Sequence, residues 1–264
     1  MLNNKFIIDT DLGSDIDDAL AIILAVIRKP TSIVGIITTS SFIHCRTVKT
    51  LQLLRTLGCN IPVFRGHENS LSNNKVFSIG TECSNIPKKI LNTQFQTNDV
   101  LWNRVLKKNI NVSVISISPL TNLADIICRI PKIKKHIKTI FIMGGVFNSR
   151  PFDQFSNKGE MSEHNLGSDP KATNIILTSG IDIVLIPLNI TFETELEKTA
   201  LRLALKNHPQ LHKLIINWTK NWLDFTHKMP VKSIFRNRIF LHDSMAVAIG
   251  MNLINHKFTK ILIS

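Results

Sequence analysis

The fold is decided by the segment Phe6-Ile7-Ile8-Asp9-Thr10-Asp11-Leu12-Gly13-Ser14-Asp15-Ile16-Asp17-Asp18-Ala19. Its first three residues are an apolar run that predicts a buried strand. Residues 17–28 have the length and apolar content of a helix. A wholly apolar strand followed closely by a helix is typical of a parallel sheet that is covered on both faces. The segment therefore predicts an α/β fold, with acidic residues directly after the first strand.

Acidic residues are concentrated in this segment. Five of the 19 acidic residues of the chain lie here, at Asp9, Asp11, Asp15, Asp17 and Asp18. Carboxylates so close together repel one another, which raises their pKa values. A hard divalent cation removes that repulsion, and carboxylate oxygens suit Ca²⁺ or Mg²⁺ better than Zn²⁺. The alternative is a solvated, acidic helix start, but one or two carboxylates suffice for that, so the pattern favours a metal site.

Strand-like and helix-like segments alternate along the rest of the chain. This pattern predicts a mainly parallel central sheet with helices on both faces, a Rossmann-like open sheet, in one domain spanning residues 1–264. Ligands of such sheets bind beyond the carboxyl ends of the strands. Two stretches without clear periodicity, 66–97 and 147–168, are expected to be loops. The expected strands are 32–38, 62–64, 112–117, 139–143 and 181–186, and the further expected helices are 47–57, 98–108, 122–130 and 170–178.

Composition excludes several classes of protein. The 264 residues are 44% hydrophobic, enough for a large core. The longest apolar run, 19–27, is about half of the 18 to 20 residues that a membrane span needs. The first residues lead straight into a strand without the apolar region of a signal peptide. The four cysteines show no metal or disulfide spacing, so we expect a reduced, cytoplasmic protein that does not bind membranes.

The net charge of +13 raises the alternative of a nucleic-acid-binding protein. Lysine and arginine, however, are spread along the chain, and no aromatic-interleaved RNA motif accompanies them. We therefore interpret the charge as a solvated basic surface, which attracts anions weakly, and expect no specific nucleic-acid partner.

The aspartate-rich segment resembles the N-terminal signature of the inosine-uridine-preferring nucleoside hydrolase family, in its longer-spaced variant. Asp-Thr-Asp after a strand is also similar to the start of a haloacid-dehalogenase-type phosphatase. We find no convincing match to the lysine or the second acidic pair of that family. Three further motifs follow in the order of the hydrolase family. They are Ser118-Pro119-Leu120-Thr121-Asn122, similar to its Gly-Pro-Leu-Thr-Asn turn, Ile142-Met143-Gly144-Gly145, and Leu241-His242-Asp243-Ser244.

The resemblance implies a nucleoside hydrolase-like fold and an N-glycosyl hydrolase that splits ribonucleosides into free base and ribose. Its implied metal ligands for Ca²⁺ are Asp11, Asp18, Asp243 and the backbone carbonyl of Thr121. Asp11 would accept a proton from the attacking water, and His242, as a second catalytic residue, would protonate the departing base. The residues that would hold the ribose hydroxyls are Asp17, Asn157, Glu163 and Asn165. The family also implies a homodimer or homotetramer.

Two features differ from the family pattern. Phe42 stands where the family has a ribose-binding Asn or Asp, and a phenyl ring cannot accept a hydrogen bond from a sugar hydroxyl. The chain also ends at Ser264, soon after the His-Asp motif, and is C-terminally short relative to the family. An alternative interpretation is therefore a noncatalytic relative that binds Ca²⁺ and a nucleoside- or ribose-like ligand.

Overall fold

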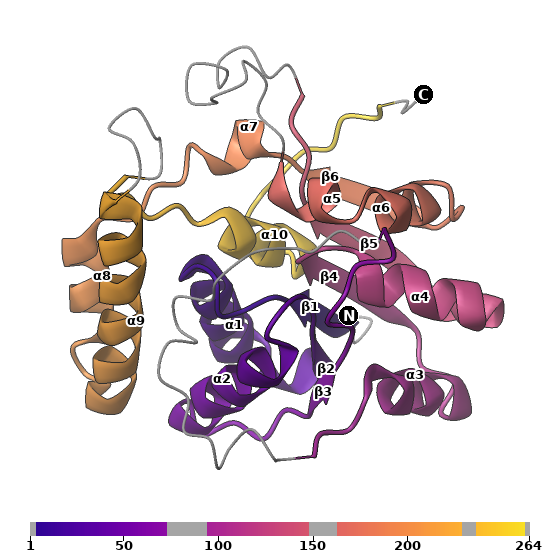
Figure 1. Ribbon diagram of the computed structural model, residues 1–264, viewed down its shortest axis with the longest axis horizontal. Coiled ribbons are helices and arrows are strands. Elements are labelled where there is room, and N and C mark those ends of the chain that lie inside the picture. The colour runs from indigo at the N-terminus through magenta and orange to yellow at the C-terminus, as the bar shows by residue number, and fades with distance from the viewer. Residues whose placement is uncertain (1–3, 73–93, 148–162, 229–235, 262–264) are drawn as a thin grey trace.

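The computed structural model describes residues 4–72, 94–147, 163–228 and 236–261, and its centre is a sheet of six parallel strands in the order β3-β2-β1-β4-β5-β6 (Figure 1). The strands are β1 (Lys5–Thr10), β2 (Ile33–Thr38), β3 (Val63–Arg65), β4 (Val112–Ile117), β5 (Ile137–Met143) and β6 (Asp182–Ile186). The α-helices are α1 (Asp17–Arg28), α2 (Ile43–Thr56), α3 (Asn98–Lys107), α4 (Thr121–Arg129), α5 (His164–Ser168), α6 (Pro170–Leu177), α7 (Leu188–Thr191), α8 (Lys198–Leu205), α9 (Pro209–His227) and α10 (His242–Gly250). Short 3-10 helices, η1 (Pro30–Ser32) and η3 (Pro131–His136), precede β2 and β5.

Helices cover both faces of the sheet, as predicted. Successive side chains of a strand point to opposite faces, and β1 shows this directly. Phe6 and Ile8 belong to a core shared with α1, α2, α9 and α10, whereas Ile7 belongs to a second core shared with α3, α4 and α6. The two groups of helices lie on opposite sides of the strands in Figure 1. Burial on both faces is the reason that β1 reads as an unbroken apolar run.

Most predicted elements match the structure closely, although the first strand is longer than expected and runs from Lys5 to Thr10. The strand at 112–117 and the helix at 17–28 have the expected bounds. The helix expected at 47–57 begins earlier, at Ile43, after a residue in the left-handed conformation, Phe42. The expected loop 147–168 contains α5, whose five residues are too few to show a helical period. This short helix is stabilised by a side-chain cap from Glu163 rather than by an apolar face.

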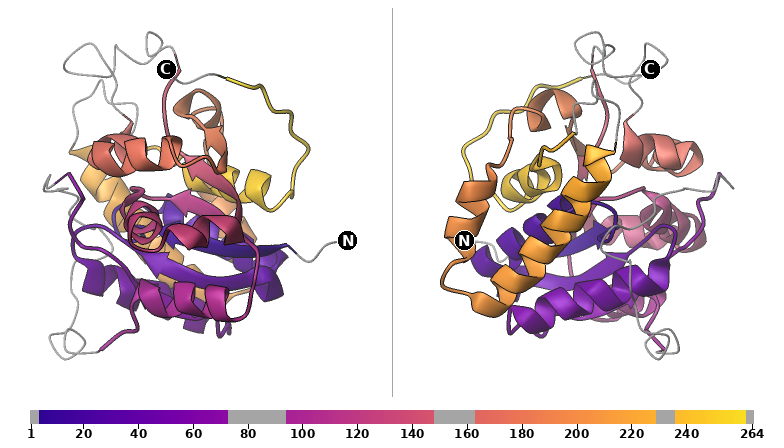
Figure 2. Two further views of the ribbon diagram at one scale, coloured as in Figure 1. Left: turned by 90° about the vertical axis from the view of Figure 1, so that its right-hand side faces the viewer. Right: turned by 60° about the vertical axis from the view of Figure 1, so that its left-hand side comes forward.

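The helices α8 and α9 add a layer that was not predicted from the sequence. In α9, Leu211, Ile215, Trp218 and Trp222 are buried at spacings of three and four residues, which is the period of a helix with one apolar face. The helix begins at Pro209, a residue favoured in the first turn. It packs against α2, outside the sheet (Figure 2). Within the described ranges, no helix is both long and apolar enough to cross a membrane.

The cysteines differ from the expected reduced state at one position. Cys45, which is buried in α2, is disulfide-bonded, whereas Cys59 and Cys128 are free thiols. The expectation that all the thiols are reduced is therefore wrong for Cys45. Spacing along the chain did not indicate this bond, because a disulfide requires proximity of the folded chain rather than a short motif.

Strand register brings the site segments together. In β1, Thr10 pairs with Thr38 of β2 on one side and with Ile117 of β4 on the other. The three strands are parallel, so the residues that follow them lie at one edge of the sheet. The segments after Thr10, Thr38 and Ile117 therefore meet at the centre of the carboxyl edge.

Candidate active site

Three buried carboxylates meet at this edge. Asp17 and Asp18 lie in the first turn of α1, and Asp243 lies in the first turn of α10. One oxygen atom from each of the three lies within 4.8 Å of the others. The helices α1 and α10 pack directly against each other, and this contact is what joins the two ends of the chain here. The structure thus brings together two of the expected metal ligands, Asp18 and Asp243, with Asp17 beside them.

The pKa values of these groups are strongly perturbed. Burial, followed by repulsion from neighbouring carboxylates, raises the pKa values of Asp17, Asp18 and Asp243 well above 3.8. Asp11 is among the repelling neighbours of both Asp18 and Asp243, so it belongs to the same acidic cluster. Without a counter-charge these groups cannot all be ionised at neutral pH. The cluster is therefore electrostatically suited to a cation.

The donor atoms fit a hard divalent metal ion. They are carboxylate oxygens, the ligand type that Ca²⁺ and Mg²⁺ prefer. Ca²⁺–oxygen distances are about 2.3–2.6 Å, so two ligands on opposite sides of one ion lie about 4.6–5.2 Å apart. The separations within the Asp17, Asp18 and Asp243 group are compatible with shared coordination.

The backbone carbonyl of Asp11 is held in place by a hydrogen bond from Arg46. Asp11 follows β1 and is buried, and its carbonyl oxygen accepts this hydrogen bond from Nη1 of Arg46 in α2. The same Nη1 lies 4.0 Å from Oδ2 of Asp11. The neighbouring Thr10 hydroxyl donates to Oδ1 of Asp18 and accepts from the backbone N–H of Leu12. These contacts fix the turn between β1 and α1.

A second network lies beneath this turn. Asn122, at the start of α4, donates from Nδ2 to Oδ1 of Asp9 (2.9 Å) and to the Thr38 carbonyl (3.2 Å). Its Oδ1 accepts from the backbone N–H of His67 at 2.7 Å. Burial raises the pKa of Asp9 to about 7, although hydrogen bonds from Asn122 and Ser118 act in the opposite direction. The buried Asn122 side chain thus connects the carboxyl ends of β1 and β2 with the segments that follow β3 and β4.

Thr121 is the remaining expected metal ligand, through its backbone carbonyl. It is the first residue of α4, and its side-chain hydroxyl donates to Oδ2 of Asp169 at 2.7 Å. Asp169 is fully buried and also caps α6 by accepting from the N–H of Ala172. The position of the Thr121 backbone is therefore coupled to a carboxylate outside the acidic cluster.

His242 lies next to Asp243 in a mostly apolar setting. Its ring packs against Phe192 (centroids 4.9 Å apart) and Phe240 (5.3 Å), and Nδ1 lies 2.7 Å from the Thr191 hydroxyl oxygen. Burial lowers the pKa of His242 to about 4. The ring is therefore neutral at pH 7 in the metal-free protein, since its pKa lies well below the ordinary histidine value of 6.5.

The expected ribose-binding residues are placed as follows. The Glu163 carboxylate accepts from the backbone N–H groups of Asn165 (2.7 Å), Leu166 (2.8 Å) and Gly145 (3.1 Å). Glu163 also lies near enough to Asp243 to raise the pKa of that residue. Asn165 is buried and donates to the Met143 carbonyl at 3.0 Å. Both side chains thus lie at the end of β5 and are oriented by the backbone. Asn157 lies outside the described residues.

Gly144 and Gly145, which follow β5, leave room for the Glu163 carboxylate to approach the end of the strand. A Cβ atom on Gly144 would lie 3.2 Å from Oε2 of Glu163 and 3.0 Å from Cγ of Leu166. Gly145 has a φ of +88°, a conformation that L side chains rarely adopt. The Gly-Gly pair therefore lets Glu163 reach the end of the strand.

Phe42 precedes α2 on the turn after β2. It has a φ of 59°, and 53% of its surface is exposed. The ring therefore lies largely in solvent, although polar Asn and Asp adopt the left-handed conformation more readily than Phe. The left-handed backbone of Phe42 is thus the conformation expected at a position that an Asn or Asp usually occupies.

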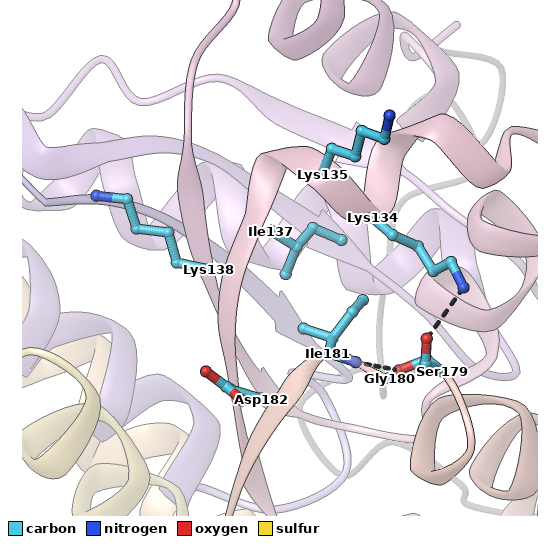
Figure 3. A pocket seen from close by; sticks show the side chains of 8 residues that line it. All are labelled: Lys134, Lys135, Ile137, Lys138, Ser179, Gly180, Ile181 and Asp182. Atoms are coloured by element: carbon cyan, nitrogen blue, oxygen red, sulfur yellow. Dashed lines mark hydrogen bonds between the residues drawn. The ribbon is translucent and has the colours of Figure 1, made fainter.

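A cavity of about 370 Å³ lies at the opposite edge of the sheet, where β5 and β6 begin. Figure 3 shows that the ammonium groups of Lys134, Lys135 and Lys138 point in different directions, and Lys134 donates to the Ser179 carbonyl at 3.0 Å. The three cations therefore do not converge on one ligand. The lining residues are Lys134, Lys135, Ile137, Lys138, Ser179, Gly180, Ile181 and Asp182.

Some residues of the site were not identified from the sequence. Asp169 could have been found, since Asp before Pro170 is a common helix start. Arg46 gave no signal, because a single arginine in a helix is usually exposed. Thr191 likewise has no sequence motif, and only its contact with His242 in the structure identifies it.

Known proteins resemble this chain throughout its length. A family model described as inosine-uridine preferring nucleoside hydrolase matches residues 6–261. Uridine nucleosidase 1 of Arabidopsis thaliana is 30% identical over 256 residues, covering 92% of this chain and 73% of the relative. Probable uridine nucleosidase 2 of Oryza sativa subsp. japonica is 28% identical over 260 residues, covering 92% and 72%. A solved plant nucleoside hydrolase, the PpNRh1 enzyme, has a TM-score of 0.73 and 24% identity, covering 95% of this chain and 79% of that one. The chain therefore belongs to the inosine-uridine preferring nucleoside hydrolase family.

Proposed function

We propose that the protein hydrolyses the N-glycosidic bond of ribonucleosides to a free base and ribose, and that its acidic cluster binds the calcium ion that this reaction requires. The observation that carries the proposal is the convergence of Asp18 and Asp243 from opposite ends of the chain, with the Asp17 carboxylate beside them. Family membership supports the reaction class. A bound divalent cation supplies a coordinated water of lowered pKa.

Asp11, Asp18, Asp243 and the carbonyl of Thr121 are the proposed metal ligands. Asp11 also accepts the proton of the attacking water, whose oxygen forms the new bond to the anomeric carbon while the bond to the base breaks. Asp17 is proposed to grip ribose, although its oxygen lies with those of Asp18 and Asp243. Asp17→Asn separates the two roles, since a ribose ligand changes KM and a metal ligand changes the Ca²⁺ Kd.

Ribose and base are held by the remaining residues. Glu163 and Asn165, together with Asn157, are proposed to hold the sugar hydroxyls. Their carboxylate and amide oxygens would also stabilise the positive charge that develops on the ribose ring as the bond breaks. His242 is proposed to face the base and donate a hydrogen bond to it as the bond breaks. Because burial lowers the His242 pKa to about 4, the donor at pH 7 is the neutral ring, whose Nδ1 is engaged with the Thr191 hydroxyl.

The direct test is release of free base and ribose. Purified protein is stripped of metal with a chelator and then assayed with uridine and inosine in the presence of Ca²⁺ or Mg²⁺. We expect turnover only with added metal. Asp243→Asn should lower kcat/KM by roughly 1000-fold, because a catalytic metal contributes several kcal/mol to transition-state stabilisation.

Asp224→Asn is the matched control, since Asp224 is exposed on α9 and does not belong to the acidic cluster. It should leave kcat/KM within twofold of the unaltered protein. A protein that binds Ca²⁺ tightly but turns over no ribonucleoside would refute the catalytic proposal and favour a noncatalytic binding role.

We further propose a homodimer or homotetramer, on the basis of the family resemblance. Light scattering coupled to size-exclusion chromatography measures the assembly, and a mass equal to the 29.8 kDa of one chain would refute it.

A further inference from the structure

Arg46 is the one lysine or arginine that is buried among the residues that the structure describes. It lies in the first turn of α2, and its side chain has no exposed surface. A buried guanidinium is unfavourable unless its N–H groups are well paired, and removing one partner of such a pair is strongly destabilising. A cation in this position therefore requires a specific reason.

The guanidinium bridges two segments of the carboxyl edge. Nη1 donates to the Asp11 carbonyl, and Nε donates to the Ser41 carbonyl at 2.6 Å. Asp11 follows β1, whereas Ser41 belongs to the turn after β2. The two donors belong to one rigid plane, so the Asp11 backbone is held at a defined place relative to the neighbouring strand.

The same group faces the acidic cluster. Nη1 lies 4.0 Å from Oδ2 of Asp11, and Asp11 in turn repels Asp18 and Asp243. Arg46 therefore contacts the cluster at Asp11, and that residue has both a ligand and a proton-accepting role in the proposed function. A displacement of Asp11 would change both metal binding and the direction in which its carboxylate points.

We propose that Arg46 is a positioning residue, which holds Asp11 so that its carboxylate keeps one orientation toward the metal and the attacking water. The proposal rests on the proposed function. Lysine cannot reproduce the contact, because its single nitrogen cannot span two carbonyls as a planar fork does. The substitution Arg46→Lys keeps the charge and removes the geometry.

The experiment compares Arg46→Lys with Arg55→Lys, an exposed arginine on the same helix. Calorimetric titration should show Ca²⁺ binding weakened about tenfold in Arg46→Lys, the loss typical when a group supporting a ligand is altered. The kcat for uridine should fall about tenfold, with KM changed less than about twofold. Arg55→Lys should match the unaltered protein in all three. Arg46→Gln, which removes the buried charge, replaces Arg46→Lys if that variant does not fold, with the same expected direction.

A double-mutant cycle tests whether Arg46 acts through Asp11. Asp11→Asn retains the carbonyl and removes the carboxylate. If Arg46 works through that carboxylate, combining Arg46→Lys with Asp11→Asn weakens Ca²⁺ binding by clearly less than the product of the single effects. Independent, multiplicative effects would overturn the proposal.

Hydrogen exchange separates this proposal from the proposed function. In the metal-free protein, amides in residues 9–18 should exchange about tenfold faster in Arg46→Lys than in Arg55→Lys. Unchanged exchange and an unchanged Ca²⁺ Kd, with only a lower Tm, would show that Arg46 merely stabilises α2. If the unaltered protein binds no Ca²⁺ and hydrolyses nothing, the proposed function fails, while the exchange of residues 9–18 still decides the role of Arg46.

Discussion

Replacing Asp169 by Asn should destabilise the protein markedly, although Asp169 lies outside the acidic cluster. Asp169 has no exposed surface and accepts hydrogen bonds from three segments of the chain: the loop after β3, the start of α4 and the first turn of α6. The donors are the N–H groups of Leu71 (2.7 Å), Ser72 (3.1 Å) and Ala172 (3.2 Å) and the hydroxyls of Ser72 (2.7 Å) and Thr121 (2.7 Å).

The expected loss of stability in Asp169→Asn follows from the hydrogen bonds that each carboxylate oxygen of Asp169 accepts. Oδ2 accepts from Leu71 and Thr121. In Asp169→Asn one oxygen becomes an NH₂ group, which cannot accept from either. Each hydrogen bond to a charged acceptor contributes about 1.5–3 kcal/mol. The Thr121 hydroxyl can rotate and accept from the new amide, so we expect the free energy of unfolding to fall by about 3 kcal/mol. For a chain of this size, that corresponds to a Tm lower by roughly 6–12 °C.

The pH dependence supplies a second test. Burial alone would raise the pKa of Asp169, but the hydrogen bonds from Ser72, Thr121 and the backbone outweigh it and hold the pKa below 3.8. A carboxyl whose pKa is lower in the folded state stabilises the fold above its unfolded pKa, and that stabilisation is lost as the pH falls through the folded value. The difference between the unaltered protein and Asp169→Asn should therefore be constant above about pH 5 and shrink below pH 3.8.

Urea denaturation of the metal-free proteins at pH 7, 5 and 3.5 measures both quantities. Asp224→Asn, which alters an exposed carboxylate in the same way, should change the unfolding free energy by less than about 0.5 kcal/mol. A loss below about 1 kcal/mol for Asp169→Asn, or one that does not decrease at low pH, would refute this account of Asp169.

Three further outcomes are expected. Adding Ca²⁺ at about 100 times its Kd should raise Tm by roughly 5–11 °C, reversibly with chelator, and this shift should be absent in Asp243→Asn; an equal shift in that variant would place the ion elsewhere. Gly66→Ala should lower the unfolding free energy by about 1–3 kcal/mol, because the added Cβ would lie 2.1 Å from Oδ1 of Asn122, and thermal unfolding that matches the unaltered protein would contradict this. Burial lowers the pKa of His242 to about 4, so the metal-free protein should lose stability as the pH falls from 6.5 towards 4. This loss of unfolding free energy should exceed that of the His242→Gln variant by up to about 3 kcal/mol. Parallel pH dependences of the two proteins in urea denaturation would show that the ring is not desolvated.

Much of the fold was predictable because its signals are local. The strand at 112–117 and the helix at 17–28 follow from apolar runs and helical periodicity, which need no knowledge of distant residues. The same kind of signal marks α9, where the buried side chains repeat at helical spacing. The helix α5 shows the limit of such signals, because its five residues depend on capping by Glu163 and on the strand end beside it.

The sequence by itself determined the chemistry available at the site. Five aspartates within residues 9–18 indicate a need for a cation, and the His-Asp motif near the end of the chain supplies matching residue types. Only the tertiary structure decided which of these groups share a site. Asp243 joins Asp17 and Asp18 because α10 packs against α1, and Arg46 reaches Asp11 because β1 and β2 are neighbours in the sheet. Such contacts join residues that are far apart along the chain, so their geometry depends on packing that no local pattern contains.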